Sequence, residues 1–91
     1  MTVLVLENVS PSLRGECTRW LLEVKTGVFL GTISAAVRER LWEMVKSRAE
    51  GGSCMIAYAA NNEQGFCMEV HGDPRRTVVD FDGLQLIKIK Q

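Results

Sequence analysis

The sequence predicts an α+β fold in which one mainly antiparallel sheet carries two helices on one of its faces. Three features lead to this prediction: an apolar run at the start, two segments with apolar residues at helical spacing, and two alternating segments joined by a polar loop. Strands and helices in this order are typical of a two-layer sandwich built around a single core.

The composition indicates one compact domain, since 46% of the 91 residues are hydrophobic and 24% are charged. A chain of this size buries only about two-thirds of the surface that its unfolded form exposes, so a second copy that covers an apolar face would add to its stability. We therefore expect a homodimer. Eleven basic residues balance eleven acidic ones, so any anion-binding surface has to be local.

The cysteines and the start of the chain indicate where the protein works. Cys17, Cys54 and Cys67 are too far apart for a zinc motif, and an odd number does not suit a secreted disulfide framework. We expect them to be small buried residues in a reducing compartment. No signal-peptide pattern and no apolar run of membrane-spanning length occurs in the sequence. The prediction is a soluble, cytoplasmic protein with no membrane partner.

The first strand and the start of the first helix are clear in the sequence. Residues 2–8 form a continuous apolar run with β-branched side chains, which is typical of a central strand covered on both faces. This places Glu7 and Asn8 at the carboxyl end of the strand. Ser10 and Pro11 then favour a helix start, with serine as the N-cap and proline in the first turn.

The end of this helix is less clear, because apolar residues continue at helical spacing as far as Val24. A short strand is expected at 28–31, and it could extend backward through 22–25 as a hairpin. Ser34 is the expected N-cap of a second helix, which ends at Gly51.

Two strands are expected next, over 53–60 and 65–71, joined by the polar loop 61–64. If Ala60 faces Gly65, one face of this pair is wholly apolar and belongs under the helices. It holds Met55, Ala57, Ala59, Phe66, Met68 and Val70. The other face is mixed, and we expect it to form the dimer interface. It holds Cys54, Ile56, Tyr58, Cys67, Glu69 and His71.

The last part of the chain adds to this sheet. A loop at 71–76 leads into a strand at 77–82, and a final alternating strand follows at 84–90. The whole pattern fits a ferredoxin-like sandwich with an added C-terminal strand. Within this single domain, residues 1–78 are expected to form the ferredoxin-like part and 79–91 a strand segment that docks a partner subunit.

Four stretches give the sequence a resemblance to a known family, and they are spread over nearly the whole chain. They are Leu6-Glu7-Asn8-Val9 with Pro11 and Leu13-Arg14-Gly15; Trp20 to Val24 with Gly27-Val28; Asn61 to Phe66; and Arg75-Arg76-Thr77 with Val79-Asp80 and Asp82-Gly83-Leu84. In these stretches the chain resembles the type I-E form of CRISPR-associated protein family two.

The resemblance implies a non-catalytic scaffold. Two copies would dimerise through their sheets, bind duplex DNA by its phosphates, and bridge dimers of the integrase subunit of the spacer-acquisition complex. An alternative that the resemblance also implies is a metal-dependent endonuclease acting on RNA or DNA. A ligand-sensing regulatory domain is a third possibility, but it would need a pocket at the dimer junction and no residue points to its ligand.

Four residues are the candidates for nucleic-acid binding. Arg75 and Arg76 follow a Gly-Asp-Pro turn, so a short stiff loop can present both guanidinium groups with little loss of entropy. Arg14 lies in the first helix, and Asn8 at the strand end could add a neutral hydrogen bond. For an arbitrary arginine, solvation or an ion pair is the more common role. The sequence departs from basic family members at Ser12 and Ala36.

Glu7 is the candidate catalytic and metal-binding residue. The resemblance implies a carboxylate at the end of the first strand, paired with its twin across the dimer, that could bind Mg²⁺ and activate water. One ligand per subunit leaves most of the coordination to water. Glu7 could instead be an ordinary strand-end carboxylate hydrogen-bonded to the start of the first helix.

The final strand is unusually apolar, and its edge favours pairing with another chain. We expect the integrase subunit to dock there through Leu84, Leu86 and Ile87. The resemblance implies that Glu63 and Asp82 meet basic residues of that partner. The strand could also close its own sheet or that of its dimer mate.

Overall fold

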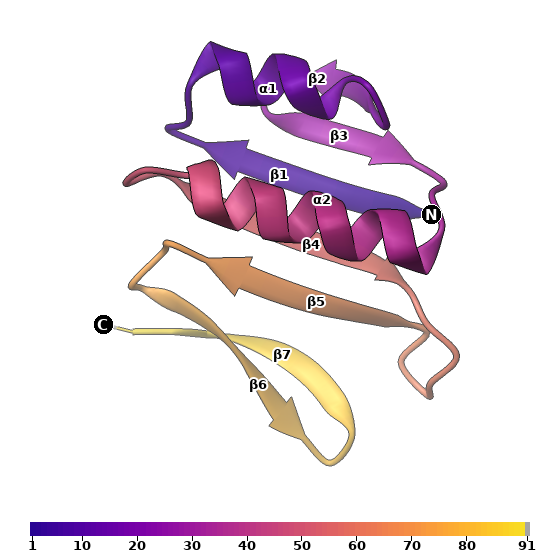
Figure 1. The fold of residues 1–91 in the computed structure, drawn as a ribbon. Helices are drawn as coiled ribbons and strands as arrows, with labels where there is room; N and C mark the ends of the chain where they lie inside the picture. The colour runs from indigo at the N-terminus through magenta and orange to yellow at the C-terminus, as the bar shows by residue number, and fades with distance from the viewer. Residues whose placement is uncertain (91) are drawn as a thin grey trace.

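The computed structural model describes residues 1–90 as a sheet of five antiparallel strands, two helices and a separate two-stranded hairpin (Figure 1). The strand order in the sheet is β2-β3-β1-β4-β5. In chain order the elements are β1 (Thr2–Glu7), α1 (Pro11–Cys17), β2 (Leu22–Lys25), β3 (Val28–Gly31), α2 (Ala35–Arg48), β4 (Ser53–Ala59), β5 (Phe66–His71), β6 (Arg76–Phe81) and β7 (Leu84–Ile89). The predicted α+β class, consistent with a ferredoxin-like fold, is confirmed. The expected C-terminal addition is a two-stranded sheet of its own.

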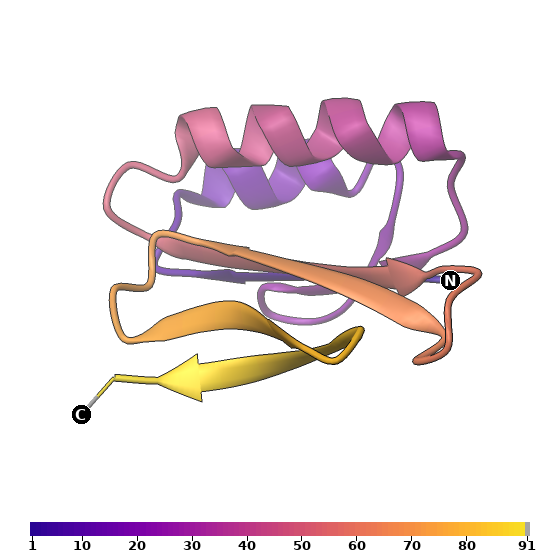
Figure 2. The same ribbon diagram turned by 90° about the horizontal axis from the view of Figure 1, so that it is seen from below.

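The core lies between the sheet and the helices. Both helices cover one face, and the β6–β7 hairpin lies on the other side, next to β5 (Figure 2). The core side chains are no more than 5% exposed; they are Leu4, Leu6, Phe29, Cys54 and Ile56 from the strands, Leu13, Cys17, Leu41, Trp42 and Val45 from the helices, and Leu21 from the turn after α1. Within residues 1–90, neither helix is long and apolar enough to cross a membrane.

Both helices begin where the sequence predicts. Ser10 Oγ accepts a hydrogen bond of 3.1 Å from the backbone N–H of Leu13, and Ser34 Oγ accepts one of 3.2 Å from Val37. Each bond satisfies one of the N–H groups that a helix start leaves without an internal partner. α2 ends at Arg48, shortly before Gly51 adopts a left-handed backbone with φ of 88°.

The first helix does not continue to Val24, and of the two alternatives that the sequence left open the hairpin through 22–25 is the one that forms. α1 ends at Cys17, and residues 22–25 form the edge strand β2, which is the hairpin that the sequence left open. Leu21 is the last apolar residue of this segment to reach the core, whereas Val24 is exposed. The β2–β3 hairpin is joined to β1 by a 2.7 Å hydrogen bond from the N–H of Leu6 to the carbonyl of Gly27, a residue with φ of 79° in the hairpin turn.

The predicted register of β4 and β5 is confirmed. Met55 lies opposite Val70, Ala57 opposite Met68, and Ala59 opposite Phe66. Beyond the ladder, the N–H of Ala60 donates to the carbonyl of Gly65, as the expected Ala60–Gly65 pair requires.

The predicted assignment of the two faces is wrong. Cys54 and Ile56 are buried under the helices, and the wholly apolar set that includes Met55 and Ala57 faces the other way. The reason lies in β1, where Leu4 pairs with Ile56 and Leu6 pairs with Cys54. Because Leu4 and Leu6 pack against the helices, their partners on β4 must do so too.

This inversion leaves an apolar surface on the side of the sheet without helices. Its side chains are half-buried in the single chain; they are Val3, Val5, Val28, Leu30, Met55, Ala57, Met68 and Val70. We call this set the helix-free face. The mixed face with Cys54 and Ile56 is therefore not the surface available to a second copy.

Two glutamines attach the hairpin to the sheet. The side chain of Gln85 on β7 accepts a 2.6 Å bond from the N–H of Met68, and it donates to the carbonyl of the same residue at 3.4 Å. Gln64 in turn exchanges two hydrogen bonds with the backbone of Gln85, at 2.8 and 2.9 Å. The expected boundary after residue 78 falls inside β6, and Gln91 of the expected 79–91 segment lies outside the described residues.

The cysteines are free thiols, and two of them belong to the core. Burial raises the pKa of Cys17 and of Cys54 to about 11, because the apolar surroundings disfavour the thiolate. Cys67 on β5 is half-buried and accepts a hydrogen bond from Asn62 Nδ2 at 3.3 Å. The prediction of buried cysteines therefore holds for Cys17 and Cys54 and in part for Cys67.

Replacement of Gly52 by alanine should destabilise the fold. A Cβ atom there would lie 2.5 Å from the carbonyl oxygen of Asn8 and 2.6 Å from that of Glu7, so the end of β1 would have to move. We expect a loss of about 2 kcal/mol in the free energy of unfolding, measured by urea denaturation.

Gly15 provides the matched control for this substitution. It lies in α1 with no atom within 4 Å of the added Cβ, so Gly15→Ala should stabilise the protein by about 0.5–1 kcal/mol. Equal unfolding midpoints for G52A and G15A would contradict the close approach of the chain at Gly52.

Candidate nucleic-acid interface

One end of the sheet gathers most of the predicted site residues. β1 ends at Glu7, which pairs with Ser53 at the start of β4, and Cys54 pairs with His71 at the end of β5. Gly72 then packs against the backbone of Gly52. Glu7, Asn8 and the loop that carries Arg75 therefore lie at the same end, on the left in Figure 1.

The backbone changes direction sharply at this end. Asn8 adopts a left-handed conformation with φ of 56°, which asparagine tolerates better than most residues, and the chain then rises to Ser10 and α1. Asn8 and Glu7 are both exposed. Their side chains are thus available at the rim of the sheet.

Asp73 organises the loop between β5 and β6. Its Oδ1 accepts a 2.9 Å hydrogen bond from the backbone N–H of Arg75, and its Oδ2 lies 3.2 Å from Nη1 of Arg76. These contacts hold the pKa of the Asp73 carboxyl below its usual range, the backbone hydrogen bond from Arg75 being the larger cause and Arg76 the next favourable one. The loop is thus fixed by an ionised aspartate.

The two arginines of this loop differ in their surroundings. Arg76 is paired with Asp73, whereas no ion pair joins the exposed guanidinium of Arg75 to another residue in the described part of the chain. Asp73 holds Arg75 through its backbone, so the side chain stays free to bind an external anion.

Arg14 occupies a different layer of the molecule. Its Nε lies 3.7 Å from Oε2 of Glu23 on β2, and that oxygen also accepts a 2.9 Å hydrogen bond from the N–H of Gly27. Arg14 belongs to the helical layer, whereas Arg75 and Arg76 lead to the hairpin on the other side of the sheet (Figure 2). Within one chain, the predicted cations therefore form two groups on opposite sides of the sheet.

Arg48 is a further cation at this end of the helical layer, and it was not among the residues predicted to bind nucleic acid. It ends α2, and its Nη2 donates a 3.3 Å hydrogen bond to Ser12 Oγ at the start of α1. The packing of the two helices thus brings a basic residue next to Ser12. The only signal in the sequence was a basic residue in the last turn of the second helix.

Glu7 lines a cavity of about 420 Å³ between the helix-free face and the hairpin. Asp73 and Arg76 line the same cavity, with apolar residues that include Met55, Val70 and Ile87. Asp73 already binds Arg76 and the N–H of Arg75, so Glu7 is the carboxylate left to coordinate an ion. Residues 1–90 contain no group of three or more His, Cys, Asp or Glu side chains placed to hold a metal. One carboxylate of this kind per chain would leave most of the coordination of a Mg²⁺ ion to water.

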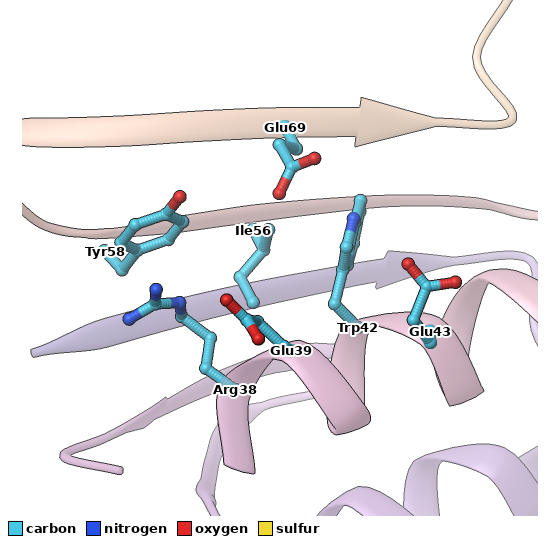
Figure 3. A pocket seen from close by; sticks show the side chains of 7 residues that line it. All are labelled: Arg38, Glu39, Trp42, Glu43, Ile56, Tyr58 and Glu69. Atoms are coloured by element: carbon cyan, nitrogen blue, oxygen red, sulfur yellow. The ribbon is translucent and has the colours of Figure 1, made fainter. Parts of the chain in front are cut away.

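A second concave surface, of about 230 Å³, lies between α2 and β5 (Figure 3). The guanidinium of Arg38 lies 3.6 Å from the centre of the Tyr58 ring, a short cation–π contact. Three carboxylates, those of Glu39, Glu43 and Glu69, line the same surface. This acidic rim does not suit a phosphate backbone.

The predicted partner residues lie on the hairpin and on the adjacent loop. Leu84, Leu86 and Ile87 are 39–47% exposed, which is high for large apolar side chains. Asp82 lies in the hairpin turn with φ of 52°. The bonds between Gln64 and Gln85 join the loop that holds Glu63 to this hairpin.

The fold and these surfaces define a small ferredoxin-like protein with an appended hairpin, whose exposed cations and apolar side chains suit the binding of other macromolecules. The family model described as CRISPR-associated protein (Cas_Cas2CT1978) matches residues 1–86, and the chain belongs to this family. Membership supports a role in CRISPR adaptation.

Proposed function

We propose that the protein is a homodimeric DNA-binding scaffold of a type I-E spacer-acquisition complex. It binds duplex DNA by its phosphates and bridges dimers of the integrase subunit in the cytoplasm, and its principal role is not catalytic. The observation that carries this proposal is the exposed Arg75 guanidinium on a loop that Asp73 holds in place.

The fixed loop favours phosphate binding. An arginine fork can donate two hydrogen bonds to one phosphate, and a loop ordered before binding loses little entropy when the anion arrives. Arg14, Arg75 and Arg76 in two copies could neutralise about six phosphates, which contributes about −5 to the log–log salt slope. Contacts of this kind carry little sequence preference, as expected for a subunit that accepts many spacers.

The helix-free face supports the dimer. Half-buried apolar side chains from four adjacent strands form a continuous surface there; the hairpin covers its β5 side, and a second copy related by two-fold symmetry would cover the remainder with an identical surface. Such a pairing also brings two copies of the Arg75 loop into one assembly, so one duplex could contact both.

The hairpin supports docking of the integrase subunit. Its exposed side chains Leu84, Leu86 and Ile87 offer apolar area, and Glu63 and Asp82 offer nearby negative charge for basic residues of the partner. Within the segment 79–91, we assign this docking to the part at and next to the hairpin turn, from Asp82 to Ile87.

Arg75→Glu should weaken binding of a short duplex by about tenfold or more at moderate salt, because it replaces a phosphate contact with a repulsive charge in each protomer. The bond from the Arg75 backbone to Asp73 does not depend on the side chain, so the loop should stay ordered. Binding is measured by fluorescence anisotropy. Arg40→Glu, an equal charge change on the exposed side of α2, is the control and should bind as the unmodified protein does. Equal affinities for all three proteins would refute the proposed site.

Ala57→Glu should separate the dimer. It places a carboxylate in the middle of the helix-free face, opposite Val3 and Met68, where a second copy would have to desolvate it. We expect the dimer dissociation constant to rise by about 100-fold or more in analytical ultracentrifugation. Ala36→Glu on the exposed start of α2 is the matched control. A57E protein that remains dimeric would place the interface elsewhere.

Hydrolysis of nucleic acid is the second candidate function, favoured by the carboxylate of Glu7, which lines the cavity beneath the hairpin. Glu7 supplies one carboxylate per chain, so we expect a Mg²⁺-dependent activity to use the Glu7 carboxylates of both copies, with water completing the coordination. Glu7→Gln should leave duplex affinity unchanged in the scaffold, and it should abolish any Mg²⁺-dependent cleavage by the purified protein. Cleavage that survives the E7Q change would rule out Glu7 as its catalytic residue.

A further inference from the structure

We propose that Lys88 of β7 and Lys90, which directly follows this strand, bind the nucleic-acid backbone together with Arg75, so that the contact continues from the loop onto the outer face of the hairpin. This inference rests on the proposed function and extends it to two residues that were not among the predicted nucleic-acid-binding residues.

The pairing of β6 with β7 brings these cations together. Lys88 lies directly opposite Thr77, and the N–H of Lys90 donates a 2.7 Å hydrogen bond to the carbonyl of Arg75. Side chains two residues apart on a strand share a face, so Lys88 and Lys90 lie on the same face as Thr77 and Arg75. Ile87 and Ile89 lie on the opposite face of the hairpin, and Ile87 lines the cavity beneath it.

A shallow cavity of about 330 Å³ marks this cluster. Its lining contains four cations and no carboxylate; it consists of Pro74, Arg75, Arg76, Thr77, Lys88 and Lys90. The nearest acid in sequence, Asp73, is already held by Arg76 and by the backbone of Arg75. Within residues 1–90, no ion pair involves Lys88 or Lys90. We call these four cations the hairpin cation cluster.

The cluster is unfavourable without an anion. Like charges that share a face across two strands destabilise the pair, and here Lys90 neighbours Arg75 while Lys88 lines the same cavity. An anion that spans the cluster removes this repulsion. The thermal midpoint of the protein should therefore rise when a polyanion binds.

The spacing favours an extended anion over a single ion. Lys88 and Lys90 are two residues apart, or about 6.8 Å along an antiparallel strand. One strand of a duplex carries a charge for each ~3.4 Å of helix axis, so both ammonium groups can neutralise phosphates of the same backbone. The Thr77 hydroxyl can add a neutral hydrogen bond.

The test compares Lys88→Gln with Lys90→Gln, made together, against the control pair Lys25→Gln with Arg40→Gln. Both double variants remove two exposed positive charges per chain, but the control residues lie on β2 and α2, away from the hairpin. Affinity for a short duplex is measured across a series of NaCl concentrations. In a dimer, the loss of four phosphate contacts should make the log–log salt slope shallower by about 3 to 4 in the lysine variant, and the control should keep the original slope.

The outcomes separate this inference from the proposed function. An unchanged slope in K88Q/K90Q, with R75E still deficient, would overturn the inference and leave the proposed function standing. Equal losses in the lysine variant and in the control would also overturn it, since they would indicate only the overall charge. If neither R75E nor K88Q/K90Q weakens binding, the proposed function itself fails. The variant that carries both Lys88→Arg and Lys90→Arg should keep the log–log salt slope of the unmodified protein, because the positive charge at these positions is retained.

Discussion

The pairing of β1 with β4 is the constraint on which the rest of the structure depends. Leu4 and Leu6 insert between the sheet and the helices, and their partners Ile56 and Cys54 must follow them. Because side chains alternate along a strand, this single register determines which residues of β4 and β5 enter the core. The same register brings the carboxyl ends of β1 and β5 to the same end of the sheet. It therefore fixes both the free apolar face and the place where the basic loop begins.

The sequence was a good guide where local chemistry decides the structure. The two serine caps, the turn before Arg75 and the β4–β5 register all follow from neighbouring residues and were predicted correctly. Which face of β4 enters the core was not predicted correctly, because that strand is largely apolar on both faces and alternation alone does not distinguish them. The choice came from β1, far away in the chain. The end of α1 was missed because Val24 continues the helical spacing although it lies in an edge strand.

The candidate site shows the same division between local and distant information. The turn residue Asp73 and the adjacent arginines could be identified from the sequence. Arg48 could not be assigned to a surface, since it reaches Ser12 through the packing of distant segments, and the neighbours of Lys88 and Lys90 depend on the register of the β6–β7 hairpin. The alternation of Lys88 and Lys90 with Ile87 and Ile89 was a signal that the two lysines share a face. Which other cations they meet depends on the ladder with β6.

The way in which the hairpin joins the sheet affects how the molecule can change shape. β6 and β7 form a two-stranded ladder of their own, which does not include β5. The hydrogen bonds that hold this unit to the sheet run through the amides of Gln64 and Gln85. Tilting of the hairpin as a rigid flap about the connecting loop would therefore break side-chain bonds and leave every backbone ladder intact. Such a flap can follow ligands of different curvature at little cost to the fold.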